Sequence, residues 1–430
     1  MVSRPHEGCT VIIFGSGGRE HTLAWKLAQS PYKPRVLVAP GNGCIPQLQR
    51  RSVDLQSAPS VLETAQNCAA DIVIFGPEAP LVAGHADNLR EHGIRVFGPS
   101  AQAARLEGSK IFTHEFCERY GVPTAPARIA WGINEARTII RTWSGDFPPV
   151  VKADGLAGGK GVKVADTMDE ASAFVEALMV GQRHGLAGNE IVFQERLRGA
   201  ECSIMALVDG TRYRMLEPAR DYKRALDGDS GENTGGMGAY SPVEDVTPKI
   251  LNEVQRDIIE PTIAGMDTDG TPFQGLLYAG LMLTKMGPKL LEFNVRFGDP
   301  ETQVVLPRLK SDLLRYLWAC SEVGGGLGDL PALEWSTQHA VGVGMTSGGY
   351  PEKFTKGFPI SGLKDAQALN GVHVFHAGTK LDGEKLLTDG GRVLAVVGLG
   401  STRMQAQSHA YSGVERIFWA KEVHRSDIGN

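Results

Sequence analysis

Residues 290–301 read LLEFNVRFGDPE, and their alternation of apolar and polar side chains is that of a β-strand with two different faces. Side chains on a strand point alternately to opposite sides of the sheet. Glu292, Asn294 and Arg296 therefore share one face, and the apolar residues at 291, 293, 295 and 297 share the other. We expect the apolar face to pack into a core and the polar face to carry chemistry.

The polar face of this strand predicts a metal site beside an anion site. Carboxylate and amide oxygens suit a Mg²⁺ ion that also holds phosphates, so Glu292 and Asn294 are the candidate metal ligands. The guanidinium of Arg296 can then hold a carboxylate or a phosphate through two parallel hydrogen bonds. The alternative is a solvated strand face stabilised by a salt bridge, which Gln or Lys would serve equally well.

A second stretch, KADGLAGGKG at residues 152–161, lies between two strand-like segments and predicts a glycine-rich flap that covers phosphates. It is not a Walker loop, because the spacing is one residue short and Gly161 stands where that loop requires Ser or Thr. Backbone N–H groups in such a turn can form a concave anion site, and the ammonium of Lys152 can reach a phosphate. The alternative is a flexible turn without a ligand.

The first 110 residues alternate short apolar segments with helical patterns, which predicts a parallel sheet with helices on both faces. Strands are expected at residues 11–14, 35–39, 71–75 and 95–97, with a helix at 19–29. Ligands bind such sheets at the carboxyl ends of the strands. Three of these ends carry turn residues, at 15–18 (GSGG), 40–42 (PGN) and 76–78 (GPE).

The turn at residues 15–18 follows a strand and opens a helix, so its N–H groups and the helix dipole can face the phosphate of a small sugar. Glu20 stands where the dinucleotide-binding fingerprint requires Gly, which disfavours a nicotinamide dehydrogenase. A tight turn without a ligand is the alternative.

The remaining residues predict two further units. Strands are expected at 150–153, 162–165, 191–195, 203–208, 276–283, 289–297, 340–345, 372–376 and 393–397, and helices near 168–179, 302–320 and 404–417. The polar, glycine-rich segment 220–238 is expected to be a mobile loop that acts as a lid. We expect domains at 1–110, 111–325 (with a flap subdomain near 125–195) and 326–430.

Composition and charge narrow the classes of function. Hydrophobic residues make up 42% and charged residues 22% of the chain, as in ordinary globular proteins. The net charge of −5 provides no reason to expect nucleic-acid binding. No stretch of about 18 apolar residues occurs, so no membrane span is expected. The six scattered cysteines argue against a zinc site or a disulfide scaffold and favour a reducing, cytoplasmic setting.

Ten stretches, in order along nearly the whole chain, resemble the phosphoribosylamine–glycine ligase family of the ATP-grasp superfamily. They are GSGGREHTLAWKLAQS from Gly15, VAPGN from Val38, GPEAPL from Gly76, FGPSAQAARLEGSK from Phe97, KADGLAGGKGV from Lys152, NTGGMGAYSP from Asn233, LYAGLM from Leu277, LEFNVRFGDPETQ from Leu291, FHAGT from Phe375 and GGRVLAVV from Gly390. The resemblance implies an α/β ATP-grasp fold with an N-terminal doubly wound parallel-sheet domain and a small C-terminal α/β domain.

The resemblance also implies a reaction of de novo purine biosynthesis. ATP, glycine and 5-phosphoribosylamine would give glycinamide ribonucleotide, ADP and phosphate through a glycyl phosphate, with Mg²⁺ as the metal and Mn²⁺ as an alternative ion. Two other functions stay open: another ATP-grasp carboxylate–amine ligase or carboxylase of purine metabolism, and a nucleotide-binding regulatory module without turnover. Small-molecule substrates are expected, and neither a nucleic acid nor a membrane.

Matching positions imply roles for single residues. The expected ATP contacts are Lys110, Lys152, Gly155, Gly158, Gly159, Gly161, Gln194, Glu195, Arg196, Leu197, Glu201, Lys223 and Asn233. The expected metal ligands are Glu292 and Asn294. Catalysis is assigned to Arg296, Asp299 and Asp221, and substrate binding to Gly17, Gly18, Asn42, Glu78 and Arg296.

The chain departs from the family at three of these places. The adenine hinge reads Gln194-Glu195-Arg196, where the family has EEL or EEF. The family's QDHK is RDYK at 220–223, which keeps Asp221 and Lys223, and Gly158 replaces a usual Ala. The chain stops at residue 430, where relatives run on for a few residues, and this is compatible with a complete protein or with the first unit of a multifunctional purine enzyme.

Overall fold

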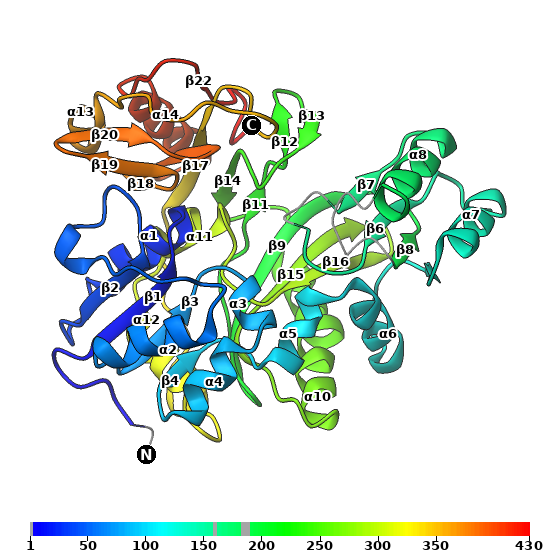
Figure 1. The fold of residues 1–430 in the computed structure, drawn as a ribbon, viewed down its shortest axis with the longest axis horizontal. Helices are drawn as coiled ribbons and strands as arrows, with labels where there is room; N and C mark the ends of the chain where they lie inside the picture. Colours follow the sequence, from blue (N-terminus) through cyan, green and yellow to red (C-terminus); the bar gives the residue numbers. More distant parts are fainter. Residues whose placement is uncertain (1–2, 158–160, 182–189) are drawn as a thin grey trace.

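The computed structural model describes residues 3–157, 161–181 and 190–430, which form four main sheets and two small hairpins (Figure 1). Helices and strands are mixed throughout, as the predicted α/β class requires. Among the described helices, none has both the length and the apolar character that a bilayer crossing needs.

The N-terminal sheet is parallel, has the order β2-β1-β3-β4, and is covered by helices on both faces. Its elements are β1 (Thr10–Gly15), α1 (Gly18–Leu27), β2 (Arg35–Pro40), α2 (Ala58–Asn67), β3 (Ile72–Phe75), α3 (Ala79–Val82), α4 (His85–Glu91), β4 (Arg95–Phe97) and α5 (Ala101–Gly108). Ile12 and Phe14 pack into one core, whereas Val11 and Ile13 pack into another, because both faces of a parallel sheet are covered. The strands predicted here are confirmed.

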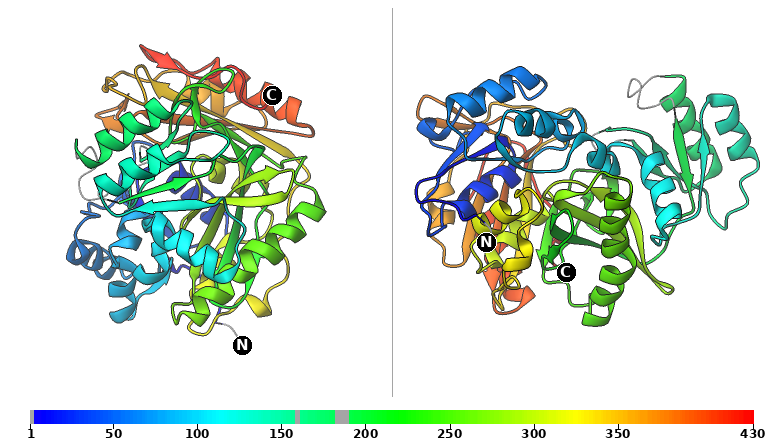
Figure 2. Two further views of the ribbon diagram at one scale, coloured as in Figure 1. Left: turned by 90° about the vertical axis from the view of Figure 1, so that its right-hand side faces the viewer. Right: turned by 90° about the horizontal axis from the view of Figure 1, so that it is seen from below.

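The flap sheet is antiparallel, has the order β5-β8-β6-β7, and carries two helices. Its elements are β5 (Ala127–Ala130), α7 (Ile133–Arg141), β6 (Val150–Ala153), β7 (Val162–Val164), α8 (Met168–Met179) and β8 (Ile191–Gln194). Seen from below in Figure 2, this unit projects to one side of the body. The glycine-rich stretch 152–161 joins β6 to β7 as predicted, but Gly158 and Gly159 lie outside the described residues.

The central sheet is antiparallel, has the order β10-β9-β15-β16, and lies between the other units. Its elements and the helices that follow or flank it are α6 (Lys110–Tyr120), β9 (Ala200–Asp209), β10 (Tyr213–Met215), α9 (Pro248–Val254), α10 (Glu260–Thr268), β15 (Gln274–Thr284), β16 (Gly287–Asn294), α11 (Glu301–Val305) and α12 (Leu313–Cys320). The single helix predicted at 302–320 is wrong. Pro307 lacks a backbone N–H donor, so the helix breaks between α11 and α12.

The strand that carries Glu292 is shorter than predicted. β16 ends at Asn294, whereas the alternation predicted a strand as far as Phe297. The N–H of Val295 donates to a carboxylate oxygen of Glu107 at 2.8 Å, so the chain leaves the sheet at this point.

The C-terminal sheet has the order β11-β14-β17-β21-β18, and β22 also pairs with β17. Its elements are β11 (Arg220–Asp221), β14 (Gly238–Ser241), β17 (His339–Ser347), α13 (Leu363–Gln367), β18 (Val372–His376), the β19 (Thr379–Asp382)–β20 (Lys385–Thr388) hairpin, β21 (Arg392–Gly400), α14 (Arg403–Val414) and β22 (Glu422–Val423). Two of its strands, β11 and β14, come from the middle of the chain. This sheet therefore joins the central unit to the C-terminal one.

The segment 220–238 is not the irregular loop that its composition predicted. It contains β11 and a hairpin of β12 (Arg224–Leu226) and β13 (Ser230–Asn233). The guanidinium of Arg425 holds this hairpin, with only 1% of its side chain exposed. It donates to Asp229 at 2.8 Å, to the carbonyl of Arg224 at 3.0 Å and to Asp427 at 2.7 Å, and it lies 4.9 Å from the ring centre of Tyr222. These contacts depend on residues about 200 positions apart, which no local pattern reveals.

Replacing Arg425 by Ala should loosen this hairpin. The change leaves partly exposed carboxylates without their cation, so we expect the free energy of unfolding to fall by roughly 1–3 kcal/mol. Denaturant titration measures the loss, and amide hydrogen exchange over 224–233 should become faster. Arg137→Ala removes an Arg–Glu176 pair on the surface and serves as the control, with a midpoint near that of the wild type. Unchanged amide exchange over residues 224–233 in Arg425→Ala would contradict the conclusion that Arg425 holds the hairpin.

Candidate functional site

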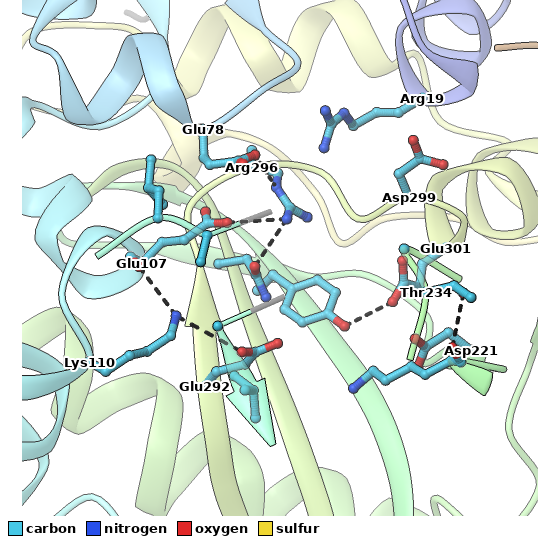
Figure 3. Close-up of a pocket in the computed structure, with 18 of the residues that line it drawn as sticks. Arg19, Glu78, Glu107, Lys110, Asp221, Thr234, Glu292, Arg296, Asp299 and Glu301 are labelled. Atoms are coloured by element: carbon cyan, nitrogen blue, oxygen red, sulfur yellow. Dashed lines mark hydrogen bonds and ion pairs between the residues drawn. The ribbon is translucent and has the colours of Figure 1, made fainter. Parts of the chain in front are cut away.

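A cavity of about 320 Å³ lies where the four sheets meet (Figure 3). Residues from each unit line it. They include Arg19 and Glu78 from the N-terminal unit, Ala153 and Gly161 from the flap, Glu292 and Asn294 from β16, and Arg392 from the C-terminal sheet. Polar and charged groups dominate the lining. The cavity therefore suits ligands with several charges rather than an apolar ligand.

Glu292 stays ionised although its side chain is half-buried. Burial alone would raise the pKa of its carboxyl, but the ammonium groups of Lys110, Lys223 and Lys152 outweigh burial and lower the pKa to about 2. The nearest of these, Lys110, begins α6 and places its nitrogen 4.0 Å from a carboxylate oxygen of Glu292. The predicted oxygen ligand is thus proton-free at neutral pH.

Lys152 lies at the end of β6, as predicted, and its side chain is buried. Its ammonium donates to the carbonyl of Leu291 at 2.8 Å, next to Glu292. Burial lowers the pKa of Lys152 to about 8. An incoming anion would raise this pKa and so favour the charged form further, because an opposite charge favours protonation of an amine.

Arg296 lies beyond the end of β16, yet its guanidinium faces the same cavity as Glu292 (Figure 3). It contacts Glu78 at 3.3 Å, Glu107 at 3.1 Å and the amide oxygen of Asn294 at 3.1 Å. The predicted grouping of Glu292, Asn294 and Arg296 is therefore confirmed, although the last residue is not in the strand. Burial alone would raise the pKa of Glu78, but Arg296, a backbone hydrogen bond and Arg19 together hold it below its usual value.

Glu107 was missed at the sequence level, because its role depends on α5 packing against the turn after β16. Its carboxylate makes an ion pair with Arg296 and also accepts a hydrogen bond from the N–H of Val295. Glu301 was also missed as a site residue, although it ends the LLEFNVRFGDPE stretch. One of its carboxylate oxygens accepts hydrogen bonds from Tyr278 at 2.8 Å and from Ser203 at 3.0 Å.

Asp221 and Lys223 line the cavity from the start of the 220–238 segment, as predicted. Lys223 makes an ion pair with Glu201 at 2.8 Å. Burial, with Glu301 and Glu201 adding to it, raises the pKa of Asp221 to about 7, although Lys223 acts in the opposite direction. This carboxyl group can therefore exchange a proton near neutral pH.

The glycine turn at 15–18 is arranged differently from the open anion site that its sequence suggested. The N–H of Gly17 donates to the carboxylate of Glu20, which thereby caps α1 internally. A Cβ at Gly15, where φ is +135°, or at Gly76 would collide with the Glu20 side chain. The glycines at these two positions therefore make room for an internal carboxylate.

A second cavity, of about 510 Å³, lies between this turn and the C-terminal unit. Gly17, Asn42, Asp299 and Arg392 line it. The amide nitrogen of Asn42 donates to the carbonyls of Ser16 at 3.1 Å and His376 at 2.8 Å, so its side chain ties the two units together.

The other predicted contacts are spread more widely. Gly155 and Gly161 line the first cavity, and Gln194 lines a small neighbouring one together with Lys152. In the described part of the chain, six predicted contact residues do not line any of these cavities: Gly18, Glu195, Arg196, Leu197, Glu201 and Asn233. Arg196 instead pairs with Asp166 at 2.9 Å, and Thr234 and Gly235 line the first cavity beside Asn233.

The donor set fits a magnesium ion that is shared with phosphates. Mg²⁺ in such sites uses one or two protein oxygens and completes its shell with waters and substrate. Glu292 supplies an ionised carboxylate, and Asn294 supplies an amide oxygen from the same face of β16. Within residues 3–157, 161–181 and 190–430, no cluster of three or more His, Cys, Asp or Glu forms a metal cage.

Three family models match the chain. They describe the N domain of phosphoribosylglycinamide synthetase at residues 9–107, its ATP-grasp (A) domain at 108–302 and its C domain at 340–430. The predicted ATP-grasp fold is thereby confirmed.

Named relatives cover nearly the whole chain. A phosphoribosylamine–glycine ligase of Xylella fastidiosa is 48% identical over 424 residues, which is 97% of each protein. The trifunctional purine biosynthetic protein adenosine-3 of Homo sapiens is 46% identical over 424 residues, which is 97% of this chain and 41% of the human protein.

Solved structures agree with these matches. A phosphoribosylamine–glycine ligase of Thermotoga maritima superposes with a TM-score of 0.82 at 33% identity, over 97% of this chain and 99% of that one. A biotin carboxylase of Campylobacter jejuni superposes with a TM-score of 0.74 at 12% identity, over 96% and 92%, and this likeness concerns the fold alone.

Asp221→Asn should change how stability depends on pH. The folded-state pKa, about 7, lies above the ordinary 3.8, so the proton on Asp221 stabilises the fold below about pH 4 and this stabilisation is lost as the pH rises to about 7. The unfolding free energy of Asp221→Asn relative to the wild type should therefore increase from about pH 4 to pH 7. Denaturant titrations at both pH values measure this difference, with Asp382→Asn at the exposed end of β19 as the control. A constant difference would contradict the raised pKa.

Proposed function

The chain belongs to the phosphoribosylglycinamide synthetase family, and on that premise we propose that it joins glycine to 5-phosphoribosylamine at the expense of ATP. The products are glycinamide ribonucleotide, ADP and phosphate, as a step of purine biosynthesis. The observation that carries the proposal is the ionised Glu292 facing Lys110, Lys152 and Lys223, with Arg296 on the same side of the cavity.

The chemistry explains why such a site is needed. A carboxylate is a poor electrophile, so an oxygen of glycine first attacks the terminal phosphorus of ATP, and ADP leaves. The amine nitrogen of phosphoribosylamine then attacks the acyl carbon, the bond from carbon to the phosphate oxygen breaks, and phosphate leaves with that oxygen. The nitrogen releases one proton. The protein contributes positioning and charge neutralisation.

We propose that the three lysines neutralise the nucleotide phosphates. Lys110 and Lys152 approach Glu292 from α6 and β6, and Lys223 approaches from the end of β11. Glu292 and Asn294 would hold Mg²⁺, which neutralises phosphate charge when bound, and Mn²⁺ prefers the same oxygen ligands.

We assign the acceptor side to Arg296, Asp299 and Asp221. The guanidinium of Arg296 can hold the glycine carboxylate with two hydrogen bonds once it exchanges a present partner. Asp299 lies toward the amine, and Asp221, with a pKa near 7, can exchange a proton at neutral pH. Glu78 supports Arg296 from the N-terminal unit.

The remaining assignments complete the proposal. The expected nucleotide contacts on the flap and hinge are Gly155, Gly158, Gly159, Gly161, Gln194, Glu195, Arg196, Leu197, Glu201 and Asn233, and those to phosphoribosylamine are Gly17, Gly18 and Asn42. We propose domains at 1–110, 111–325 and 326–430. We also propose that the protein acts in the cytoplasm. The proposal holds equally for a separate ligase and for a unit of a multifunctional purine enzyme such as the human relative.

An ADP-release assay with each substrate omitted in turn tests this function. We expect release only when ATP, glycine and phosphoribosylamine are all present, with glycinamide ribonucleotide formed in equal amount. Release that depends on a different acceptor would indicate another ATP-grasp ligase or carboxylase. Nucleotide binding without release would indicate a regulatory module.

Glu292→Ala should nearly abolish turnover while the fold remains intact, because the carboxylate that would hold Mg²⁺ beside the phosphates is lost. Asn294→Ala should act in the same direction but more mildly. The measurement is the rate of ADP release as a function of Mg²⁺ concentration, with Glu176→Ala on the surface as the control. Wild-type rates for both site variants at limiting Mg²⁺ would contradict the metal assignment.

Arg296→Lys should weaken use of glycine or phosphoribosylamine far more than binding of ATP. A lysine keeps the charge but cannot reproduce a planar fork with two parallel hydrogen bonds. A lost charge-assisted pair in a closed site costs about 2–4 kcal/mol, or roughly 30- to 1000-fold in kcat/KM. Arg214→Lys, a change at another arginine that binds backbone carbonyls far from the cavity, is the matched control. An equal loss of ATP binding in Arg296→Lys would place this residue on the nucleotide side instead.

A further inference from the structure

The first and second cavities share two lining residues, Asp299 and Arg392. Glu292, Lys110 and Lys223 line the first cavity. The second cavity lies between the glycine turn of the N-terminal unit and the β19–β20 side of the C-terminal unit. A bond between ligands that occupy different cavities has to form where the cavities meet. Asp299 and Arg392 mark that place.

Arg392 reaches this junction from the start of β21, far along the chain from every other residue that lines the first cavity. Its guanidinium makes an ion pair with the carboxylate of Asp299 at 3.1 Å and donates to the backbone carbonyl of the same residue at 2.9 Å. It also donates to the carbonyl of Gly235, whose loop lines the first cavity. One side chain thus connects a loop of the first cavity with the residue that faces both.

Asp299 is held from several sides. Gln303 donates to one carboxylate oxygen at 2.7 Å, and Arg392 contacts the other. Burial alone would raise the pKa of Asp299, but Arg392 and Arg19 outweigh it and hold the pKa below its usual value. Asp299 is therefore an ionised acceptor of fixed orientation, which suits an amine or hydroxyl donor at the junction.

The second cavity has the chemistry of a sugar site. Asp299 and Asp389 supply two carboxylates that can accept hydrogen bonds from hydroxyl and amine groups. Arg392 pairs with the first carboxylate at 3.1 Å, and the ammonium of Lys356 lies 3.7 Å from the second. A polyhydroxylated ligand with an amine directed toward the first cavity matches this lining better than a simple anion does.

We propose that Arg392 is a positioning residue for the ligation step, which holds the carboxylate of Asp299 at the junction where the amine of the sugar substrate meets the activated carboxyl group. This inference rests on the proposed function. Arg392 acts through Asp299 and does not itself contact the reacting atoms. It makes the C-terminal unit a part of the active site.

Tyr350 supplies a matched control. Its hydroxyl accepts the N–H of Gly235 at 3.0 Å, so it ties the same loop to the C-terminal unit without contacting Asp299. If Arg392 only anchored that loop, Tyr350→Phe and Arg392→Gln would have similar effects. If Arg392 acts through Asp299, only Arg392→Gln should resemble Asp299→Asn.

The test is calorimetric binding of glycinamide ribonucleotide and of ADP to the full chain. Arg392→Gln and Asp299→Asn should each weaken glycinamide ribonucleotide binding by roughly 10- to 100-fold, with ADP affinity changed by less than about threefold. The double variant should bind glycinamide ribonucleotide no more weakly than the more affected of the two single variants, because both changes disrupt the same Arg392–Asp299 pair. Arg392→Lys should lie between Arg392→Gln and the wild type, and Tyr350→Phe should bind both ligands like the wild type.

Three results would overturn the inference: wild-type binding in Arg392→Gln, additive losses in the double variant, or parallel losses for both ligands. If Arg392→Gln does not fold, the single and double variants are made with Arg392→Lys instead, and the same criteria apply. A wild-type protein that neither binds glycinamide ribonucleotide nor forms it would refute the proposed function, and this inference with it.

Discussion

The carboxylate of Glu292 and the ammonium groups that face it impose the constraint on which the rest of the structure depends. A half-buried carboxylate is destabilised without compensating charge, and so are the half-buried ammonium groups of Lys110 and Lys223 and the buried one of Lys152. Here Lys110, Lys152 and Lys223 outweigh the cost of burying Glu292 and hold its pKa at about 2. The same arrangement leaves three cations beside one oxygen ligand, which is what a polyphosphate and its metal ion require.

That balance explains why the chain brings distant segments to one point. Lys110 begins α6, Lys152 ends β6 and Arg392 begins β21, and each belongs to a different structural unit. These segments converge on the strand β16, because its polar face lines the cavity and its apolar face packs into a core. The strands β11 and β14 pair into the C-terminal sheet, and this pairing fixes the segment that carries Asp221 and Lys223.

Local patterns were sufficient for the parts of the site that lie on single strands. Alternation predicted that Glu292, Asn294 and Arg296 share one face of a strand; the first two do, and Arg296 reaches the same cavity from beyond the end of the strand. Strand spacing predicted the N-terminal parallel sheet. The same patterns failed where a distant residue decides the local structure. Glu107 ends β16 early by accepting the N–H of Val295, and Arg425 orders a hairpin that composition alone suggested was a mobile loop. Arg392 stood in a stretch that only resemblance singled out, since its partner Asp299 is 93 positions away.

The central claim is that ATP activates the carboxylate of glycine, and an isotope transfer tests it most directly. The protein is supplied with ATP, phosphoribosylamine and glycine whose carboxylate oxygens are both ¹⁸O, and the released inorganic phosphate is analysed by mass. A glycyl phosphate that is attacked at its carbonyl carbon has to leave one labelled oxygen in each phosphate and the other in the amide. We expect one ¹⁸O per phosphate. Phosphate that carries no label while glycinamide ribonucleotide is formed would contradict the account.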